Sequence, residues 1–231
     1  MTEPTTPTTP ELSQLPSSGA MLRTLIGVAA VAGTLIVVVF QLTLPIIKAK
    51  KAEALRRAVF DVLPGARNVL TFRLEDDGSL TPLTGEDERA VKYYAGYSED
   101  HQLIGVAIEA QGQGYQDVIK VLYGYTPVEQ QIIGMKVLES KETPGLGEKI
   151  GKDRAFLANF DKLNARLTEN GTKLEHAFEV VKPGAKKHPW QIDGITGATI
   201  SSKAVGKLLN DSAPRRLPPV VKNISRLKER K

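Results

Sequence analysis

The chain has 231 residues, which suits one main folded unit with an anchor or tails and excludes a large multidomain enzyme. Lys and Arg outnumber Asp and Glu by 31 to 26, and a net charge of +5 does not indicate nucleic-acid binding. With no cysteine there is no disulfide, Cys-ligated iron–sulfur cluster or thiol nucleophile, so redox chemistry would need an organic cofactor or another subunit. The three histidines stand at no metal-ligand spacing, and we predict no metal site.

The first 50 residues divide into a polar tail and an apolar segment. Proline, threonine and serine dominate residues 1–20, which predicts a disordered tail. No charged residue occurs between Thr24 and Ile47, and about 20 apolar residues are what a helix needs to cross a bilayer. We predict a transmembrane helix over residues 21–47. The alternatives are a cleaved signal peptide, whose apolar part is typically about 7–15 residues, and a buried core helix.

The charges beside this segment favour one orientation. Arg23 is the only basic residue before it, whereas Lys48, Lys50, Lys51 and Arg56 crowd its far end. The positive-inside rule therefore places the large C-terminal part in the cytoplasm, although the rule weakens when a long domain is translocated.

The rest of the chain alternates between helical and strand patterns. Leu55, Val59 and Leu63 repeat at fourfold spacing before Pro64, which predicts a stalk helix over residues 48–65 that continues the membrane helix. Strand patterns occur at 91–97, 103–109, 118–123, 131–138 and 177–181, and helical patterns at 152–164 and 200–209. We predict an α+β fold: a soluble domain over residues 66–212 with a mainly antiparallel sheet flanked by helices.

Three further patterns indicate chemistry only weakly. Gly112 and Gly114 precede a strand, whereas a dinucleotide-binding glycine motif follows one, so a turn is the better interpretation. The basic cluster of Lys182, Lys186 and Lys187 suits either a phosphate or a solvated loop. Residues 213–231 form a basic tail for which lipid, a partner subunit and a frayed terminus all remain open, and Pro218-Pro219 predicts a break in any helix there.

Residues 193–199, Asp-Gly-Ile-Thr-Gly-Ala-Thr, predict a helix N-terminus because apolar residues at helical spacing follow them. Asp193, Thr196 and Thr199 are all candidate N-cap residues, and Gly197-Ala198 lets a ligand approach the backbone. The free N–H groups and dipole of a helix start favour a phosphate. A capped helix after a tight turn explains the same residues.

The motif resembles the pattern Asp-x-x-Ser/Thr-Gly-Ala-Thr of FMN-binding domains that carry flavin on a phosphoester bond, and every position fits. Residues 142–147, Glu-Thr-Pro-Gly-Leu-Gly, resemble the second signature of that family, a loop lying against the flavin. With the membrane span, residues 20–210 are similar to the G subunits of Rnf electron transport complexes. The C subunits of sodium-pumping NADH:quinone reductases are near relatives.

The resemblance implies covalent FMN, joined through its phosphate to the hydroxyl of Thr199 by a separate flavin transferase. It implies no catalytic acid, base or nucleophile. Ser201 or Ser202 is expected to donate to the phosphate and Leu146 to pack on the flavin ring, whereas Glu142 either joins this site or forms a salt bridge. A plain strand-connecting turn remains the alternative for residues 142–147. The expected cofactor-binding residues are Thr199, Thr196, Gly197, Ala198, Ser201, Glu142, Thr143, Gly145, Leu146 and Gly147.

The implied function is electron transfer within a membrane complex that couples it to ion translocation, with no pumping or catalysis by this chain alone. Its partners are then the other proteins of the complex, the flavin transferase and membrane lipid. The family also implies a single-pass protein of the bacterial inner membrane with a periplasmic domain, against the charge count. Three alternatives remain: a C-type subunit of a sodium-pumping reductase, a membrane-anchored flavin-binding sensor, and a scaffold whose Thr199 only caps a helix.

Overall fold

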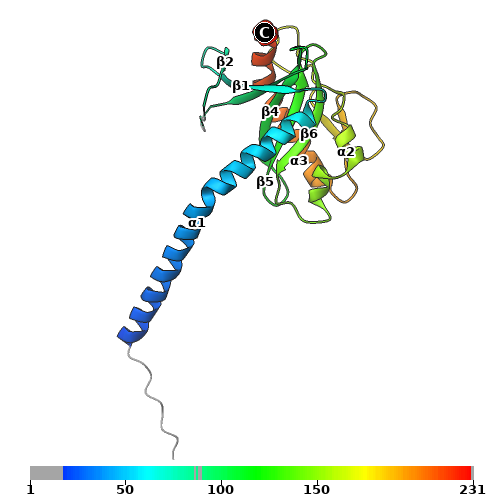
Figure 1. Cartoon of the computed structure of the whole chain (residues 1–231). Helices are drawn as coiled ribbons and strands as arrows, with labels where there is room; N and C mark the ends of the chain where they lie inside the picture. The colour runs from blue at the N-terminus through cyan, green and yellow to red at the C-terminus, as the bar shows by residue number, and fades with distance from the viewer. Residues whose placement is uncertain (1–17, 86, 88–89, 230–231) are drawn as a thin grey trace, which may run out of the picture. The chain divides into compact units, whose positions relative to one another are not determined.

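The computed structural model describes residues 18–85, 87 and 90–229, in two compact units, residues 1–51 and residues 52–231. Most of the predicted tail and the last two residues lie outside the described residues. Helix α1, Ser18–Val62, runs without a break through the predicted membrane span and most of the predicted stalk (Figure 1). It ends before Pro64 and Gly65, and Gly65 has a positive φ of 91° that favours glycine.

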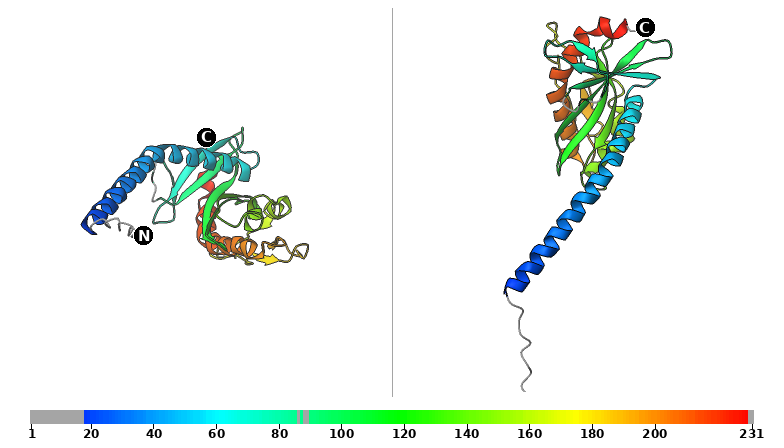
Figure 2. Two further views of the ribbon diagram at one scale, coloured as in Figure 1. Left: turned by 90° about the horizontal axis from the view of Figure 1, so that it is seen from below. Right: turned by 60° about the vertical axis from the view of Figure 1, so that its left-hand side comes forward.

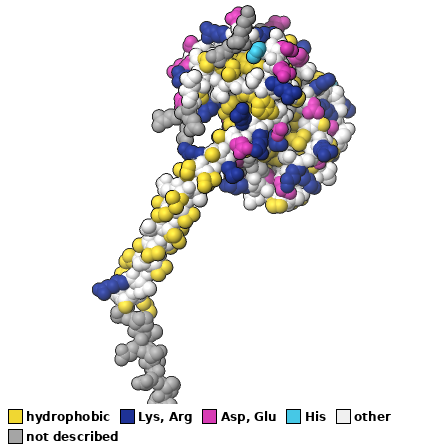
Figure 3. Space-filling view, viewed as in Figure 1, with side chains coloured by type: hydrophobic (Ala, Val, Ile, Leu, Met, Phe, Trp, Pro, Cys, Tyr) yellow, Lys and Arg dark blue, Asp and Glu magenta, His cyan; other side chains and the backbone are white. Residues whose placement is uncertain are grey.

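The apolar part of α1 is exposed along its length. Its most apolar window has a mean hydropathy of 2.5 and no buried residue, which argues against a buried core helix. Hydrophobic side chains cover the visible face of this part (Figure 3). Among the described residues, α1 is the one helix long and apolar enough to cross a membrane.

Seven antiparallel strands form the main sheet, in the order β2-β1-β3-β4-β5-β6-β7. They are β1 Asn68–Leu74, β2 Leu80–Pro82, β3 Lys92–Tyr97, β4 Leu103–Gln113, β5 Val118–Thr126, β6 Gln131–Glu139 and β7 Leu163–Asn164. The predicted hairpin is β3–β4, and the other two strands predicted before residue 140 are β5 and β6. A separate parallel pair joins β8, Glu179–Val181, to β9, Gln191–Asp193. The predicted α+β class and mainly antiparallel sheet are confirmed.

Both faces of the sheet are buried, and the strands alternate between them. Helix α3, Thr199–Lys222, packs on one face, where Ile108 and Tyr123 join its Leu208 in the larger core cluster. The end of α1 packs on the other face, where Ala107 and Leu122, the sequence neighbours of those strand residues, meet it. Figure 2 shows the two helices on opposite sides of the sheet.

A row of glycines lets the end of α1 approach the sheet closely. Val62 and Leu63 lie over one glycine in each of four adjacent strands, two pairs in direct register: Gly96 with Gly105, and Gly124 with Gly134. A Cβ atom at Gly124 would lie 2.1 Å from the carbonyl oxygen of Val62, so the contact requires glycine.

We expect Gly124→Ala to destabilise the domain by about 3 kcal/mol, because the methyl group overlaps backbone that cannot move aside as a side chain would. Gly151→Ala is the matched control, since a Cβ atom there meets only side-chain atoms of Val137, at 3.4 Å. Urea unfolding monitored by circular dichroism measures both changes. Equal effects of the two substitutions would contradict the close packing.

Two helix predictions were wrong in extent. Within residues 152–164 only α2, Arg154–Ala158, is helical, and a 3₁₀ turn, Gly147–Gly151, precedes it. Asp153 caps α2, and the side chain of Asn159 ends it, since its Nδ2 atom donates to the carbonyl oxygen of Phe156 at 3.0 Å. Residues 163–164 instead pair with β6.

The predicted break at Pro218-Pro219 does not occur, because α3 continues through Pro214, Pro218 and Pro219 to Lys222. Tertiary contacts offset the missing N–H groups: Leu217 and Val220 are fully buried, and Asn223 Nδ2 donates to the carbonyl oxygen of Gly78 at 3.0 Å. A short helix α4, Ile224–Lys228, follows, with its Leu227 also buried. Residues 213–229 are thus part of the folded domain, not a frayed terminus.

Candidate functional site

The motif at residues 193–199 connects β9 to α3, and α3 begins at its last residue, Thr199. The expectation of a side-chain cap was wrong, because the N-cap residue is Ala198 and no side chain caps the helix. Asp193 instead belongs to β9, where its backbone N–H donates to Asn159 Oδ1 at 3.0 Å and its carbonyl accepts from Asn159 Nδ2 at 3.2 Å. This double contact fixes the strand that leads into the motif.

The two signatures meet around one hollow of about 360 Å³. Three segments line it: the turn between β4 and β5, the loop at residues 142–147, and the start of α3. The lining residues are Tyr115, Thr143, Leu146, Gly147, Gly197, Ala198, Thr199, Ile200 and Ser201. Of the predicted site residues, Glu142, Gly145 and Thr196 are absent from the lining.

The rim of the hollow is apolar and unusually exposed. The side chains of Tyr115, Leu146 and Ile200 are 64%, 50% and 57% exposed. Isolated exposed apolar residues are common, but three around one hollow indicate a binding surface. A flat aromatic ring would cover this apolar area.

The floor of the hollow offers backbone donors. The backbone N–H groups of Thr199, Ile200 and Ser201 have no hydrogen-bond acceptor among the described residues, as expected for the first turn of a helix without a cap. Thr199 itself is exposed, and Gly197 has a φ of 80° with no heavy atom nearer than 3.9 Å to a Cβ atom placed there. A phosphate therefore fits this helix start, beside an accessible threonine hydroxyl.

Glu142 lies beneath the hollow and links its three walls. The residue is only 5% exposed, and its carboxylate accepts from the Ser201 hydroxyl and, at 3.0 Å, from the backbone N–H of Gln116. Gly114 and Gly147 pack against it so closely that a Cβ atom on either would lie within 2.5 Å of a carboxylate oxygen. The structure thus places Glu142 in a hydrogen-bond network rather than in a salt bridge.

The hydrogen bonds keep this carboxylate ionised despite its burial. Burial alone raises the pKa of Glu142, but donation from Ser201 and from the backbone of Gln116, Asp117 and Tyr115 outweighs it, and the pKa falls below its ordinary value of 4.5. The charge therefore strengthens the contacts between the loop, the turn and α3.

The two serines are not free to bind a phosphate through their hydroxyl groups. Ser201 Oγ donates to Glu142, while Ser202 Oγ donates to the carbonyl oxygen of Ala198 at 2.9 Å and accepts from the N–H of Ile195. The prediction that Ser201 or Ser202 donates its hydroxyl to the phosphate therefore differs from the structure. The position of the two serines on the helix did not predict the hydrogen bond to Glu142, which is distant in the sequence.

The other predicted patterns lie outside the hollow or differ in role. Gly112 lies near the end of β4. Gly114 begins the turn that follows, because the N–H of Gly114 donates to the carbonyl oxygen of Asp117 at 2.9 Å, and this confirms the turn interpretation. Tyr115, in that turn, was missed as a site residue, although an exposed aromatic next to glycines was the available signal. Within the described residues no group of side chains suits a metal ion.

Sequence comparisons place this site in a family. A family model described as an FMN-binding domain matches residues 114–213, which include all three walls of the hollow. The G subunit of the ion-translocating oxidoreductase complex of Methanosarcina acetivorans is 29% identical over 198 residues, 83% of this chain and 90% of the relative. The G subunit of the Na⁺-translocating ferredoxin:NAD⁺ oxidoreductase complex of Acetobacterium woodii is 30% identical over 66% of this chain and 69% of its own length.

Solved structures share the fold. NqrC of Shewanella oneidensis matches 79% of this chain and all of its own chain, with a TM-score of 0.61 and 19% identity. The C subunit of the Na⁺-translocating NADH-quinone reductase of Parabacteroides distasonis gives a TM-score of 0.54 at 18% identity, over 80% of this chain and 97% of its own. At these identities the likeness concerns the fold alone.

Proposed function

Because the chain belongs to the family of G subunits of ion-translocating oxidoreductase complexes, we propose that it is the membrane-anchored, FMN-carrying electron-transfer subunit of such a complex. The observation that carries this proposal is the meeting of an exposed threonine hydroxyl, free helix N–H groups and an apolar rim in one hollow. When bound, FMN accepts electrons and passes them on.

The residues present suit a covalently held FMN. We infer that the Thr199 hydroxyl oxygen forms the ester bond to the FMN phosphate, with a separate flavin transferase making the bond. The free N–H groups at the start of α3 would hold the phosphate, and Gly197 would leave room beside it. Tyr115, Leu146 and Ile200 would cover the ring and exclude water from one side of it. The tether keeps the carrier bound between turnovers.

Electron transfer is distinguished from flavin-based sensing by a kinetic measurement. In membrane vesicles holding the intact complex, we expect the flavin on this chain to be reduced on the timescale of turnover when a low-potential donor is added. Flavin absorbance recorded by stopped flow, with Thr199→Ala vesicles as the baseline, measures this rate. Reduction much slower than turnover would favour a sensor.

We further propose that the folded domain lies on the periplasmic side of the bacterial inner membrane, as the family resemblance implies. The chain has no native cysteine, so single cysteines report its topology. Val128→Cys, at an exposed turn after β5, should react with a membrane-impermeant maleimide in intact spheroplasts, whereas Thr5→Cys should react only after lysis. The reverse pattern would place the domain in the cytoplasm, in agreement with the positive-inside rule.

A further inference from the structure

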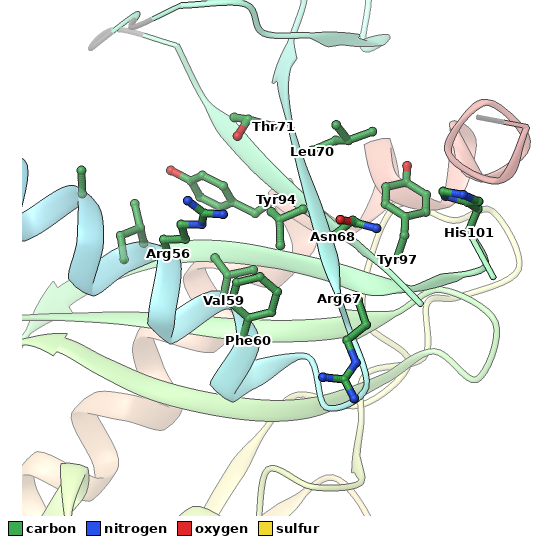
Figure 4. A pocket seen from close by; sticks show the side chains of 13 residues that line it. Arg56, Val59, Phe60, Arg67, Asn68, Leu70, Thr71, Tyr94, Tyr97 and His101 are labelled. Carbon is green, nitrogen blue, oxygen red and sulfur yellow. The ribbon is translucent and has the colours of Figure 1, made fainter. Parts of the chain in front are cut away.

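A second hollow, of about 850 Å³, lies on the other face of the sheet from α3 and takes no part in the flavin site. It lies between the last turns of α1, strands β1 and β3, and the turn that follows β3 (Figure 4). We call it the α1 groove and define it by Leu55, Arg56, Phe60, Arg67, Val69 and Tyr94, which lie among its lining residues.

An apolar strip runs along the α1 groove. Leu55, Val59 and Phe60 present one side of α1 to it, and Val69 of β1 faces them. Leu55, Phe60 and Val69 are only partly buried, so this apolar surface reaches the open part of the groove. Such a surface suits a hydrocarbon chain.

The charged side chains that line the groove are both basic. They are Arg56 and Arg67, and no acidic residue lines it. Neither forms an ion pair among the described residues. Both nearby acidic residues of α1 are already paired, Glu53 with Arg57 and Asp61 with Lys136 at 3.0 Å. The groove therefore complements an anion attached to an apolar chain.

The position of the groove in the sequence indicates where such a molecule comes from. Ala52, its first lining residue, follows the last residue of the apolar run, Ile47, by five positions. Five residues span at most about 18 Å even when fully extended, so the groove residues of α1 begin close to the membrane surface.

We propose that the α1 groove binds an anionic phospholipid of the surrounding membrane, with its phosphate at Arg56 and an acyl chain along Leu55, Phe60 and Val69. Arg67, which is exposed, also lines the groove and adds positive charge to it. A bound lipid of this kind would fix the domain to the membrane surface beyond the hold of the single helix, independently of the flavin.

The test places the photoreactive residue benzoylphenylalanine at Thr71, which lies on the α1 side of β1 (Figure 4), in the full-length chain in native membranes. After irradiation, the mass of the purified chain should increase by that of an anionic phospholipid. The same residue at Val128, exposed and outside the groove, should give no lipid adduct. Placement at Val69, another lining residue, repeats the test if the Thr71 variant folds poorly.

Substitutions of two neighbouring arginines distinguish binding at a specific site from a general attraction of anionic lipid to positive charge. Arg56→Gln should lower the yield of lipid adduct about fivefold, the factor expected for one cation at an anionic surface. Arg57→Gln should leave it unchanged, because Arg57 lies outside the lining and pairs with Glu53. A cross-link to another polypeptide, a zwitterionic lipid adduct, no adduct at all, or equal losses in both variants would overturn the proposal.

Discussion

Thr199→Ala should remove all flavin fluorescence from the denatured chain in a gel, when the protein is produced together with a flavin transferase. The substitution deletes the one oxygen that we propose forms the ester with the FMN phosphate. It should change the free energy of unfolding by less than about 0.5 kcal/mol, because Thr199 is exposed and caps nothing. Fluorescence imaging of the gel and thermal unfolding measure the two effects.

Thr196→Ser is the matched control for this experiment. Thr196 is exposed and lies outside the lining of the hollow, and the motif accepts either Ser or Thr at this position, so the change should leave the fluorescence intact. Fluorescence that persists in Thr199→Ala would contradict attachment at Thr199, and its loss in Thr196→Ser would show that any change to the motif prevents attachment.

Glu142→Ala should destabilise the domain by about 2–3 kcal/mol and weaken flavin attachment as well. It leaves the buried Ser201 hydroxyl and the N–H of Gln116 without their acceptor, and it opens space between Gly114 and Gly147. Urea unfolding measures the stability, and the fraction of chain carrying flavin measures the attachment. A variant as stable as the wild type would show that the network does not hold the walls together.

The same carboxylate predicts a dependence on pH. Because the pKa of Glu142 is lower in the folded chain than its ordinary value of 4.5, its stabilising contribution is complete above that value. The contribution is lost as the pH falls through the lower, folded-state pKa. Glu142→Gln should therefore flatten the acid limb of the stability curve, whereas the exposed Glu175→Gln should leave its shape unchanged.

Local patterns predicted the parts of the fold that depend on short segments. Alternation of apolar residues identified β3 to β6, and the 193–199 motif identified the start of α3. The extent of α3 was not predictable in the same way, since Pro218 and Pro219 oppose a helix locally. The segment is helical because Leu217 and Val220 are buried in the core, and the residues next to the prolines do not reveal this burial.

The site was predictable as two motifs but not as a network. The loop at residues 142–147 and the motif at 193–199 each contribute three residues to one hollow. The bond between Glu142 and Ser201 joins residues 59 positions apart and appears only when the sheet brings them together. Likewise, the four glycines beneath the end of α1 form one contact surface only when β3 to β6 pair in register, and this pairing is not visible in the sequence.

The central claim is that FMN is bound through the hydroxyl of Thr199, and one peptide tests it most directly. Trypsin cleavage after Lys187 and Lys203 releases residues 188–203, which contain both threonines of the motif. From native membranes, mass spectrometry should find this peptide heavier by FMN less one water, with fragment ions that assign the addition to Thr199. An unmodified peptide, or an addition on Thr196, would contradict the account.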